Sequence, residues 1–378
     1  MKKIITMGIF FVIINMLASE TVIPSGSVDG IWNLSGSPYI IEGDIYLNAG
    51  DQLTIEAGVQ VLWTEFDKFE VSGQLNIQGS LSEPVILTTY DADDFWKGIE
   101  FYQADQNSII ENALISNAGN GLYLDQSDIT IINTVIFYEY DASRLNTSDT
   151  GLTITQGNNS YLENCDITGY AKGIVIVNDD LNTSSTPIIV NTRVRNSAES
   201  DRAKSTGIKL EGVTAPTFDN CLIEGYQTGL DIANRTSSES TPVIINTRVR
   251  NSPETERNGK STGILSDGYV SFDLIDCELE HFDTGLNLKN NSLVYNSTPT
   301  LHGTRVRYSP ESDRKNTVGL NIQGNISPSI TSCNIIDYDK GITQKNNDLP
   351  VVVITILTDT QIILAGEVDR AVTKGIEF

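Results

Sequence analysis

The strongest constraint on the fold of this chain is a spacing of 56 residues that recurs in three separate series of positions. In a stacked repeat protein each unit contacts only its neighbours, so the period can continue without closing a globular core. A period kept over more than 200 residues therefore predicts a solenoid, although 378 residues would otherwise suggest two or three globular domains. The series are Cys165, Cys221, Cys277 and Cys333; Gly173, Gly229, Gly285 and Gly341; and Gly151, Gly207, Gly263, Gly319 and Gly375.

Each 56-residue unit contains two copies of one shorter pattern. The first copy runs from Pro216 through Asn220 and Cys221, and the second from Pro242 through Asn246 and Thr247. A short apolar strand, a turn at Asn, a second strand and a third strand opening at Gly describe one three-sided coil. A β-propeller would need four strands per unit and closure. The pattern predicts an all-β chain, a single-stranded parallel β-helix of about 11 or more coils.

Stacking places equivalent residues of neighbouring coils about 4.8 Å apart. Two ladders are expected, an inward one of Thr and Cys and, beside it, one of Asn in the turn. Successive cysteines are then about 10 Å apart, beyond the roughly 7 Å limit for a disulfide, so four buried free thiols are expected and a cysteine metal site is excluded. The inward ladder comprises Thr134, Cys165, Thr192, Cys221, Thr247, Cys277, Thr304 and Cys333; the Asn ladder comprises Asn112, Asn133, Asn164, Asn191, Asn220 and Asn246.

The first hundred residues carry a family resemblance. The segments Pro38–Leu47, Gly50–Trp63, Gly73–Gly79 and Trp96–Phe101 resemble the opening of secreted right-handed β-helix proteins of the pectin-lyase-like superfamily, found on bacterial surfaces. The resemblance covers nearly the whole mature chain and implies a right-handed coil. The resemblance is specific for the fold. It is weak for activity, because polysaccharide lyases, hydrolases, epimerases and adhesins all share this fold.

The chain divides into three segments. Residues 1–19, with a basic start, an apolar run and small residues, are expected to be a secretory signal peptide; a buried N-terminal strand or helix is the alternative. Residues 20–100 are expected to form irregular N-terminal coils and a cap, and residues 101–378 the regular helix. Because Phe378 falls in the middle of a coil, truncation at the C-terminus is expected.

Charge and hydropathy limit the partners. A formal net charge of −24 repels phosphate backbones, which excludes nucleic acid as an expected partner. The expected signal peptide predicts a secreted or cell-surface location. No later segment approaches a membrane-spanning length, so no membrane span is expected in the mature chain.

Arginine is the most regular outward feature. Thr-Arg-Val-Arg recurs three times, and a charged loop follows each copy (residues 199–202, 254–257 and 311–314). The pattern favours a solvent-facing ion-pair network, and the alternative is docking of an anionic glycan by Arg forks. The six arginines are Arg193, Arg195, Arg248, Arg250, Arg305 and Arg307.

An aromatic residue also recurs every 56 residues, at Tyr170, Tyr226, Phe282 and Tyr338. A row of rings could stack on the sugars of an extended polysaccharide. The alternative, which the Phe favours because it has no hydroxyl, is that each ring seals the corner of its own coil.

Catalytic and metal motifs are weak. The pectate-lyase-like, polygalacturonase-like and epimerase-like patterns are absent, and His281 and His302 occupy unrelated places in the coil, so no catalytic residue is assigned. The acidic loop Asp91, Asp93 and Asp94 is a candidate calcium site, and Asn178–Asp180 a similar acidic turn, but the nonapeptide of calcium-binding β-rolls is missing. No other cofactor is expected.

These observations lead to three functional hypotheses. The first is an extracellular, non-catalytic β-helix scaffold for adhesion or for binding of polysaccharide or cell-surface glycan. The second is a polysaccharide lyase or glycoside hydrolase acting on an acidic glycan, which needs carboxylates converging in a groove. The third is a structural passenger for a missing C-terminal module.

Overall fold

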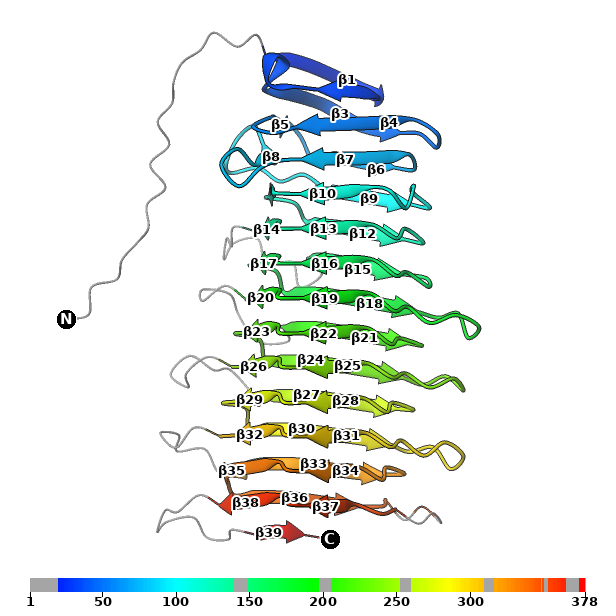
Figure 1. The fold of residues 1–378 in the computed structure, drawn as a ribbon, viewed down its shortest axis with the longest axis vertical. Helices are drawn as coiled ribbons and strands as arrows, with labels where there is room; N and C mark the ends of the chain where they lie inside the picture. Colours follow the sequence, from blue (N-terminus) through cyan, green and yellow to red (C-terminus); the bar gives the residue numbers. More distant parts are fainter. Residues whose placement is uncertain are drawn as a thin grey trace, which may run out of the picture.

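The computed structural model describes residues 20–138, 149–196, 205–251, 260–308, 316–347, 349, 353–364 and 374–377. The expected signal peptide and the three charged loops that follow the Thr-Arg-Val-Arg copies lie outside the described residues. Within them the chain winds into stacked coils along one axis, from the N-terminal end to the C-terminal end (Figure 1). No described helix is long and apolar enough to cross a membrane.

The described coils build three parallel faces, and all but the first give one strand to each face. Within the described residues face 1 is a sheet of 13 strands, which makes 13 rungs, and the expectation of about 11 or more is confirmed. Face 1 comprises β2 (Gly30–Trp32), β4 (Gln52–Glu56), β7 (Gln74–Gln78), β10 (Ile109–Glu111), β13 (Thr130–Ile132), β16 (Tyr161–Glu163), β19 (Ile188–Val190), β22 (Thr217–Asp219), β25 (Val243–Ile245), β28 (Asp273–Ile275), β31 (Thr300–His302), β34 (Ser329–Thr331) and β37 (Ile356–Thr358).

Face 2 follows face 1 across a tight turn and has short strands. It comprises β5 (Gln60–Trp63), β8 (Val85–Thr89), β11 (Ala113–Ser116), β14 (Val135–Phe137), β17 (Asp166–Thr168), β20 (Arg193–Arg195), β23 (Leu222–Glu224), β26 (Arg248–Arg250), β29 (Glu278–Glu280), β32 (Arg305–Arg307), β35 (Asn334–Tyr338) and β38 (Gln361–Leu364).

Face 3 closes each coil. It comprises β6 (Lys68–Val71), β9 (Gly98–Tyr102), β12 (Asn120–Asp125), β15 (Thr150–Thr155), β18 (Lys172–Asn178), β21 (Thr206–Gly212), β24 (Thr228–Asn234), β27 (Thr262–Gly268), β30 (Thr284–Asn290), β33 (Val318–Gly324), β36 (Lys340–Lys345) and β39 (Lys374–Glu377). At the N-terminal end β3 (Tyr39–Leu47) spans faces 2 and 3, and β1 (Thr21–Ser27) pairs with it; a 3-10 turn, η1 (Leu34–Gly36), lies between β2 and β3.

The Asn ladder fixes the turn between faces 1 and 2. The six asparagines have φ between 49° and 55°, the left-handed conformation that Asn tolerates better than most residues. Side-chain amides also bond between coils, as from Asn220 Nδ2 to Asn191 Oδ1 at 2.7 Å. The ladder is confirmed, and Asp276, Gly303 and Ser332 continue the same left-handed geometry where Asn is replaced.

The Thr/Cys ladder lies inside the coil, as expected. Its members are at most 4% exposed, and all four cysteines are free thiols. The ladder is also polar: Cys221 N donates to Thr247 Oγ1 at 3.2 Å in the next coil, and Thr247 Oγ1 donates to the Ile245 carbonyl at 2.8 Å. Threonine and cysteine can occupy the same inward position because the Thr hydroxyl and the Cys thiol both donate to the carbonyl two residues earlier.

Candidate functional site

The six arginines lie outward on face 2 and are between 34% and 51% exposed. Each is paired with a carboxylate of an adjacent coil. Arg195 contacts Asp166 at 2.7 Å and Arg250 contacts Glu224 at 2.7 Å. The other arginines contact carboxylates in the pairs Arg193–Asp166 (3.9 Å), Arg248–Glu278 (2.7 Å), Arg248–Glu280 (3.5 Å), Arg305–Glu278 (3.5 Å) and Arg307–Asp337 (3.5 Å).

The carboxylates are thus interleaved with the arginines along the axis. Strands β17, β23, β29 and β35 place acidic residues between the Arg strands β20, β26 and β32. An anionic glycan would have to displace these carboxylates, which weakens the docking interpretation and supports the ion-pair network.

The recurring aromatics do not form a sugar platform. Tyr170, Tyr226, Phe282 and Tyr338 are at most 1% exposed, so the stacking interpretation is wrong for these four rings. The physical reason is the glycine series: Cβ atoms built on Gly121 and Gly151 would lie 3.2 Å from the Tyr170 hydroxyl and 3.1 Å from its Cδ2. One ring fills the room left by glycines of two coils, which explains why the aromatic recurs only every second coil.

The acidic loop Asp91, Asp93 and Asp94 does not converge on a cation position. All three side chains are exposed, and Asp91 Oδ1 accepts a hydrogen bond from the Asp93 backbone N–H at 3.2 Å, so that carboxylate stabilises its own turn. Among the described residues no group of three or more His, Cys, Asp or Glu side chains could hold a metal ion. The Asn178–Asp180 turn behaves similarly: bonds from Asn182 and Thr183 lower the pKa of Asp180.

A different set of outward residues gathers on the N-terminal part of face 3. Register places Tyr46 beside Glu70, Glu70 beside Glu100, and Glu100 beside Tyr123 on successive strands. Tyr102 stands beside Asp125 in the next outward row. We call this set the tyrosine–carboxylate face: Tyr46, Lys68, Glu70, Glu100, Tyr102, Tyr123 and Asp125, all of them partly exposed.

Hydrogen bonds fix the geometry of this face. Lys68 Nζ lies 2.8 Å from Glu70 and 3.1 Å from Glu100, and these bonds raise the pKa of the lysine. The Tyr102 hydroxyl donates to Glu100 at 3.2 Å; burial first, then the Glu100 charge, raises the pKa of Tyr102 to about 12. The rings of Tyr102 and Tyr123 are 5.7 Å apart and tilted by 50°. Two oriented rings therefore flank a fixed carboxylate.

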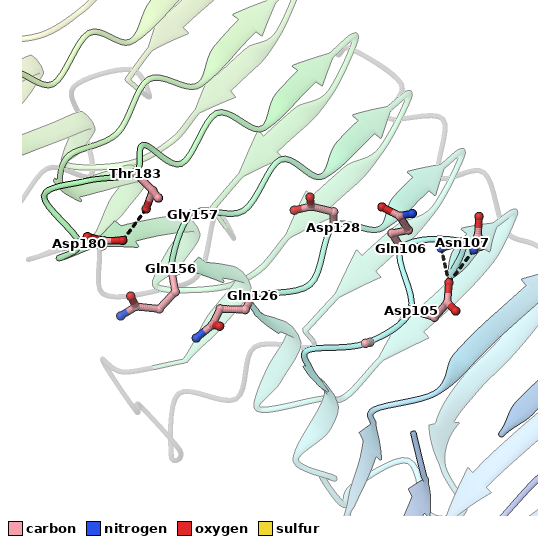
Figure 2. Close-up of a pocket in the computed structure, with 10 residues that line it drawn as sticks. Asp105, Gln106, Asn107, Gln126, Asp128, Gln156, Gly157, Asp180 and Thr183 are labelled. Atoms are coloured by element: carbon pink, nitrogen blue, oxygen red, sulfur yellow. Dashed lines mark hydrogen bonds between the residues drawn. The ribbon is translucent and has the colours of Figure 1, made fainter. Parts of the chain in front are cut away.

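A polar groove of about 650 Å³ continues from this face at the turn toward face 1. Gln126 and Gln156 directly follow Asp125 and Thr155, and Figure 2 shows their side chains projecting from neighbouring coils. Gln103, which follows Tyr102, donates to Gln126 Oε1 at 3.2 Å. The groove adds exposed amide donors and acceptors to the rings and carboxylates.

These glutamines are held in an unfavourable backbone conformation. Gln103, Gln126 and Gln156 have φ of 47°, 48° and 60°, a region that non-Gly residues other than Asn and Asp rarely adopt. In later coils the same stacked position is occupied by left-handed glycines, among them Gly212 and Gly268, alternating with buried asparagines. Retained backbone strain of this kind clusters at ligand sites.

A second charged cluster lies further along face 3. Asp231 stands between Lys209 and Leu265 on neighbouring strands, and Lys209 Nζ contacts Glu211 at 2.6 Å. Burial raises the pKa of Asp231; Lys209 opposes the rise, while Glu211 and Asp267 add to it. A partly buried carboxyl beside a lysine is a general-base candidate.

Neither of the two face 3 clusters was predicted from the sequence. In Gly98-Ile-Glu-Phe-Tyr the apolar Ile99 and Phe101 alternate with Glu100 and Tyr102, which is the period-two signal of an outward charged and aromatic pair. That signal stands in coils that do not carry the 56-residue repeat.

Comparison with known proteins supports the fold. Residues 91–241 match the sequence profile of the family described as right handed beta helix region. No curated protein sequence matches the chain significantly.

Three solved structures are similar to this chain at low sequence identity. The alginate lyase from Paenibacillus sp. str. FPU-7 is 13% identical, with 68% of this chain and 88% of that chain covered and a TM-score of 0.36. The periplasmic alginate epimerase AlgG is 10% identical (90% and 85% covered, TM-score 0.43), and the Streptococcus pneumoniae surface protein and adhesin PfbA is 11% identical (95% and 91% covered, TM-score 0.31). The matched profile and the stacked parallel coils agree that this chain is a right-handed parallel β-helix.

Proposed function

We propose that this protein is a secreted or cell-surface scaffold that binds glycan without cleaving it, and that the glycan lies on the tyrosine–carboxylate face and the adjoining glutamine groove. The observation that carries the proposal is the Tyr102–Tyr123 pair, partly exposed and fixed beside Glu100. The apolar segment at residues 4–17 supports the location.

The chemistry of the face suits a sugar chain. A sugar ring presents apolar C–H groups on its faces and hydroxyls at its rim, and a tyrosine offers both an apolar ring and a polar tip. Glu100, Asp125 and the groove amides supply acceptors and donors for the hydroxyls. Because the strands are stacked in register, the surface runs along the axis, as an extended polymer requires.

The geometry argues against hydrolysis at this face. Glu70 and Glu100 both contact Lys68 Nζ, so their oxygens are no more than about 6 Å apart, close to the roughly 5–5.5 Å separation of retaining glycosidases. The ammonium, however, occupies the space between the carboxylates where a glycosidic oxygen would have to lie. The pair is therefore a fixed recognition element.

A lyase is the second candidate function, and the Asp231–Lys209 cluster is the observation that favours it. A lyase needs a base near a cation that stabilises the developing negative charge. Lys209 is already bonded to Glu211, which leaves this cluster a weaker candidate than the tyrosine–carboxylate face.

A glycan array followed by titration calorimetry tests the proposal. Replacing Tyr102 and Tyr123 by Ala should weaken binding of any array hit at least about tenfold, a loss of about 1.4 kcal/mol. The matched control replaces Tyr269 and Tyr295, a neighbouring pair of partly exposed rings with centroids 5.0 Å apart that lies outside the face. That control should bind like the wild type.

Equal losses in both double variants would contradict the site. Shortened oligosaccharides from the purified protein would contradict the non-catalytic proposal, and Asp231→Asn then asks whether the second cluster is responsible. Binding to no glycan would favour the passenger hypothesis.

A further inference from the structure

The charge around the tyrosine–carboxylate face is strongly one-sided. Outward carboxylates at Glu70, Glu100 and Asp125 are joined at the start of the strands by Asp44, Glu65 and Asp67, while the lysines among these described residues are Lys68 and Lys97. The Asp44 carboxylate accepts the backbone N–H of Lys68 at 2.9 Å, so these groups form one continuous surface.

Both lysines are already engaged. Lys68 bridges Glu70 and Glu100, and Lys97 lies 3.7 Å from Asp44 and 5.8 Å from the centre of the exposed Phe66 ring. An anionic sugar would meet the remaining carboxylates without a free ammonium to bind. Burial raises the pKa of Asp67, and the charges of Asp44 and Glu65 raise it further against the opposing charge of Lys97.

A cationic sugar would be attracted to the carboxylates of this face. A protonated amine can bond a carboxylate that pairs with neither lysine, such as Asp125, and can also lie over the face of Tyr123, where the ring quadrupole attracts it. The same tyrosines that stack a sugar ring therefore favour an amino group on it.

We propose that the glycan bound on this face carries free, protonated amino groups and is not a uronic-acid polymer. This inference rests on the proposed function and names the ligand class of the same site.

Three oligosaccharides of equal length test it by calorimetry at about pH 6, where the amine is charged. They are the β-1,4-linked hexamer of glucosamine, the same hexamer fully N-acetylated, and a galacturonate hexamer. The glucosamine hexamer should bind about tenfold more tightly than its acetylated form in low salt. The preference should shrink at high ionic strength, and the galacturonate hexamer should not bind.

Charge variants show whether this face is responsible. Glu70→Gln with Glu100→Gln should lower the preference for the amine to about twofold or less. The control, Glu83→Gln with Asp359→Asn, removes the same charge from exposed positions outside the face and the groove and should keep the preference. Equal losses in both variants would show general attraction of a polycation and would overturn the inference.

The outcomes separate the two proposals. If the acetylated hexamer binds as tightly as the amine and binding still needs Tyr102 and Tyr123, the inference fails while glycan binding stands. Tighter binding of galacturonate would likewise overturn the inference. If no hexamer binds and the array is empty, both fail.

Discussion

At one stacked position the early coils and the repeated coils differ. After β9, β12 and β15 the turn carries the exposed glutamines Gln103, Gln126 and Gln156, in a backbone conformation that costs free energy. In the repeat region the same position alternates between a buried Asn and a left-handed Gly, which form the turn without strain. At this position the repeat region has residues that stabilise the coil, and the early coils have glutamines that project polar groups.

The surface charges differ in the same way. In the repeat region the arginines of face 2 are neutralised by carboxylates of the neighbouring coil. On the early part of face 3 carboxylates outnumber lysines and tyrosine rings are partly exposed. The periodic features are therefore structural, and the tyrosine–carboxylate face lies before the 56-residue glycine and cysteine series begin.

The largest expected effect tests the closed core of the repeat region and concerns the reactivity of its four cysteines. Burial raises the pKa of Cys165 to about 11 and of Cys221 and Cys277 to about 12, so these thiols stay neutral and enclosed. In the native protein a thiol reagent at about pH 8 should modify all four at least about a thousandfold more slowly than after unfolding. Fast labelling of any of the four, or recovered cystine, would show that the ladder is not closed.

The next effect concerns the glycine series. A Cβ at Gly207 would lie 2.4 Å from Ile223 Cγ2 and 2.7 Å from the Gly229 carbonyl oxygen, so Gly207→Ala should lower the free energy of unfolding by about 1–3 kcal/mol. Gly119→Ala is the control, because its Cβ would meet atoms only at 3.8 Å or beyond. Urea denaturation midpoints measure both. Similar losses of unfolding free energy in the two variants would show that the glycine series is not required for close packing between coils.

A smaller effect separates two aromatics of the same series. The Tyr170 hydroxyl donates to the Ala118 carbonyl at 3.0 Å, whereas the buried Tyr226 hydroxyl has no hydrogen-bond partner among the described residues. Tyr170→Phe should cost about 1 kcal/mol of unfolding free energy, and Tyr226→Phe should be neutral or stabilising. Thermal unfolding monitors both variants. A larger loss at Tyr226 would mean that its hydroxyl is satisfied by ordered water.

The smallest effect sharpens the functional side of the comparison. Gln126→Gly should leave the unfolding free energy within about 1 kcal/mol, yet weaken glycan binding about threefold because an amide is lost from the groove.

Arg248→Ala with Arg250→Ala should change stability by less than about 1 kcal/mol and leave binding unchanged, since both arginines serve ion pairs. Calorimetry with the same glycan distinguishes them, and weaker binding in the arginine variant would return face 2 to consideration.

The 56-residue repeat allowed the parallel β-helix to be predicted from the sequence. The positions of Cys221 and Asn220 within the unit predicted buried thiols and a turn at Asn, because a position that recurs in every coil must meet the same environment each time. The sugar-stacking interpretation of Tyr226 failed because periodicity cannot tell an inward corner ring from an outward one.

The site could not be read in the same way. Glu100 and Tyr102 alternate with apolar residues in a single strand, but Glu70 and Tyr123 lie some thirty and twenty residues away in the sequence, and only register brings them together. The partners of the arginines were also unforeseen, since the interleaving of Asp166 and Glu224 depends on which strands are neighbours.

The sequence by itself determined the parallel coil, the inward ladder and the free thiols, because these follow from a period and a fixed rise per coil. Only the tertiary structure decided which rings are buried, which charges neutralise each other and where carboxylates remain in excess. Those properties depend on contacts between neighbouring coils, and such contacts are set by stacking register and side-chain direction, which the order of residues along one strand does not contain.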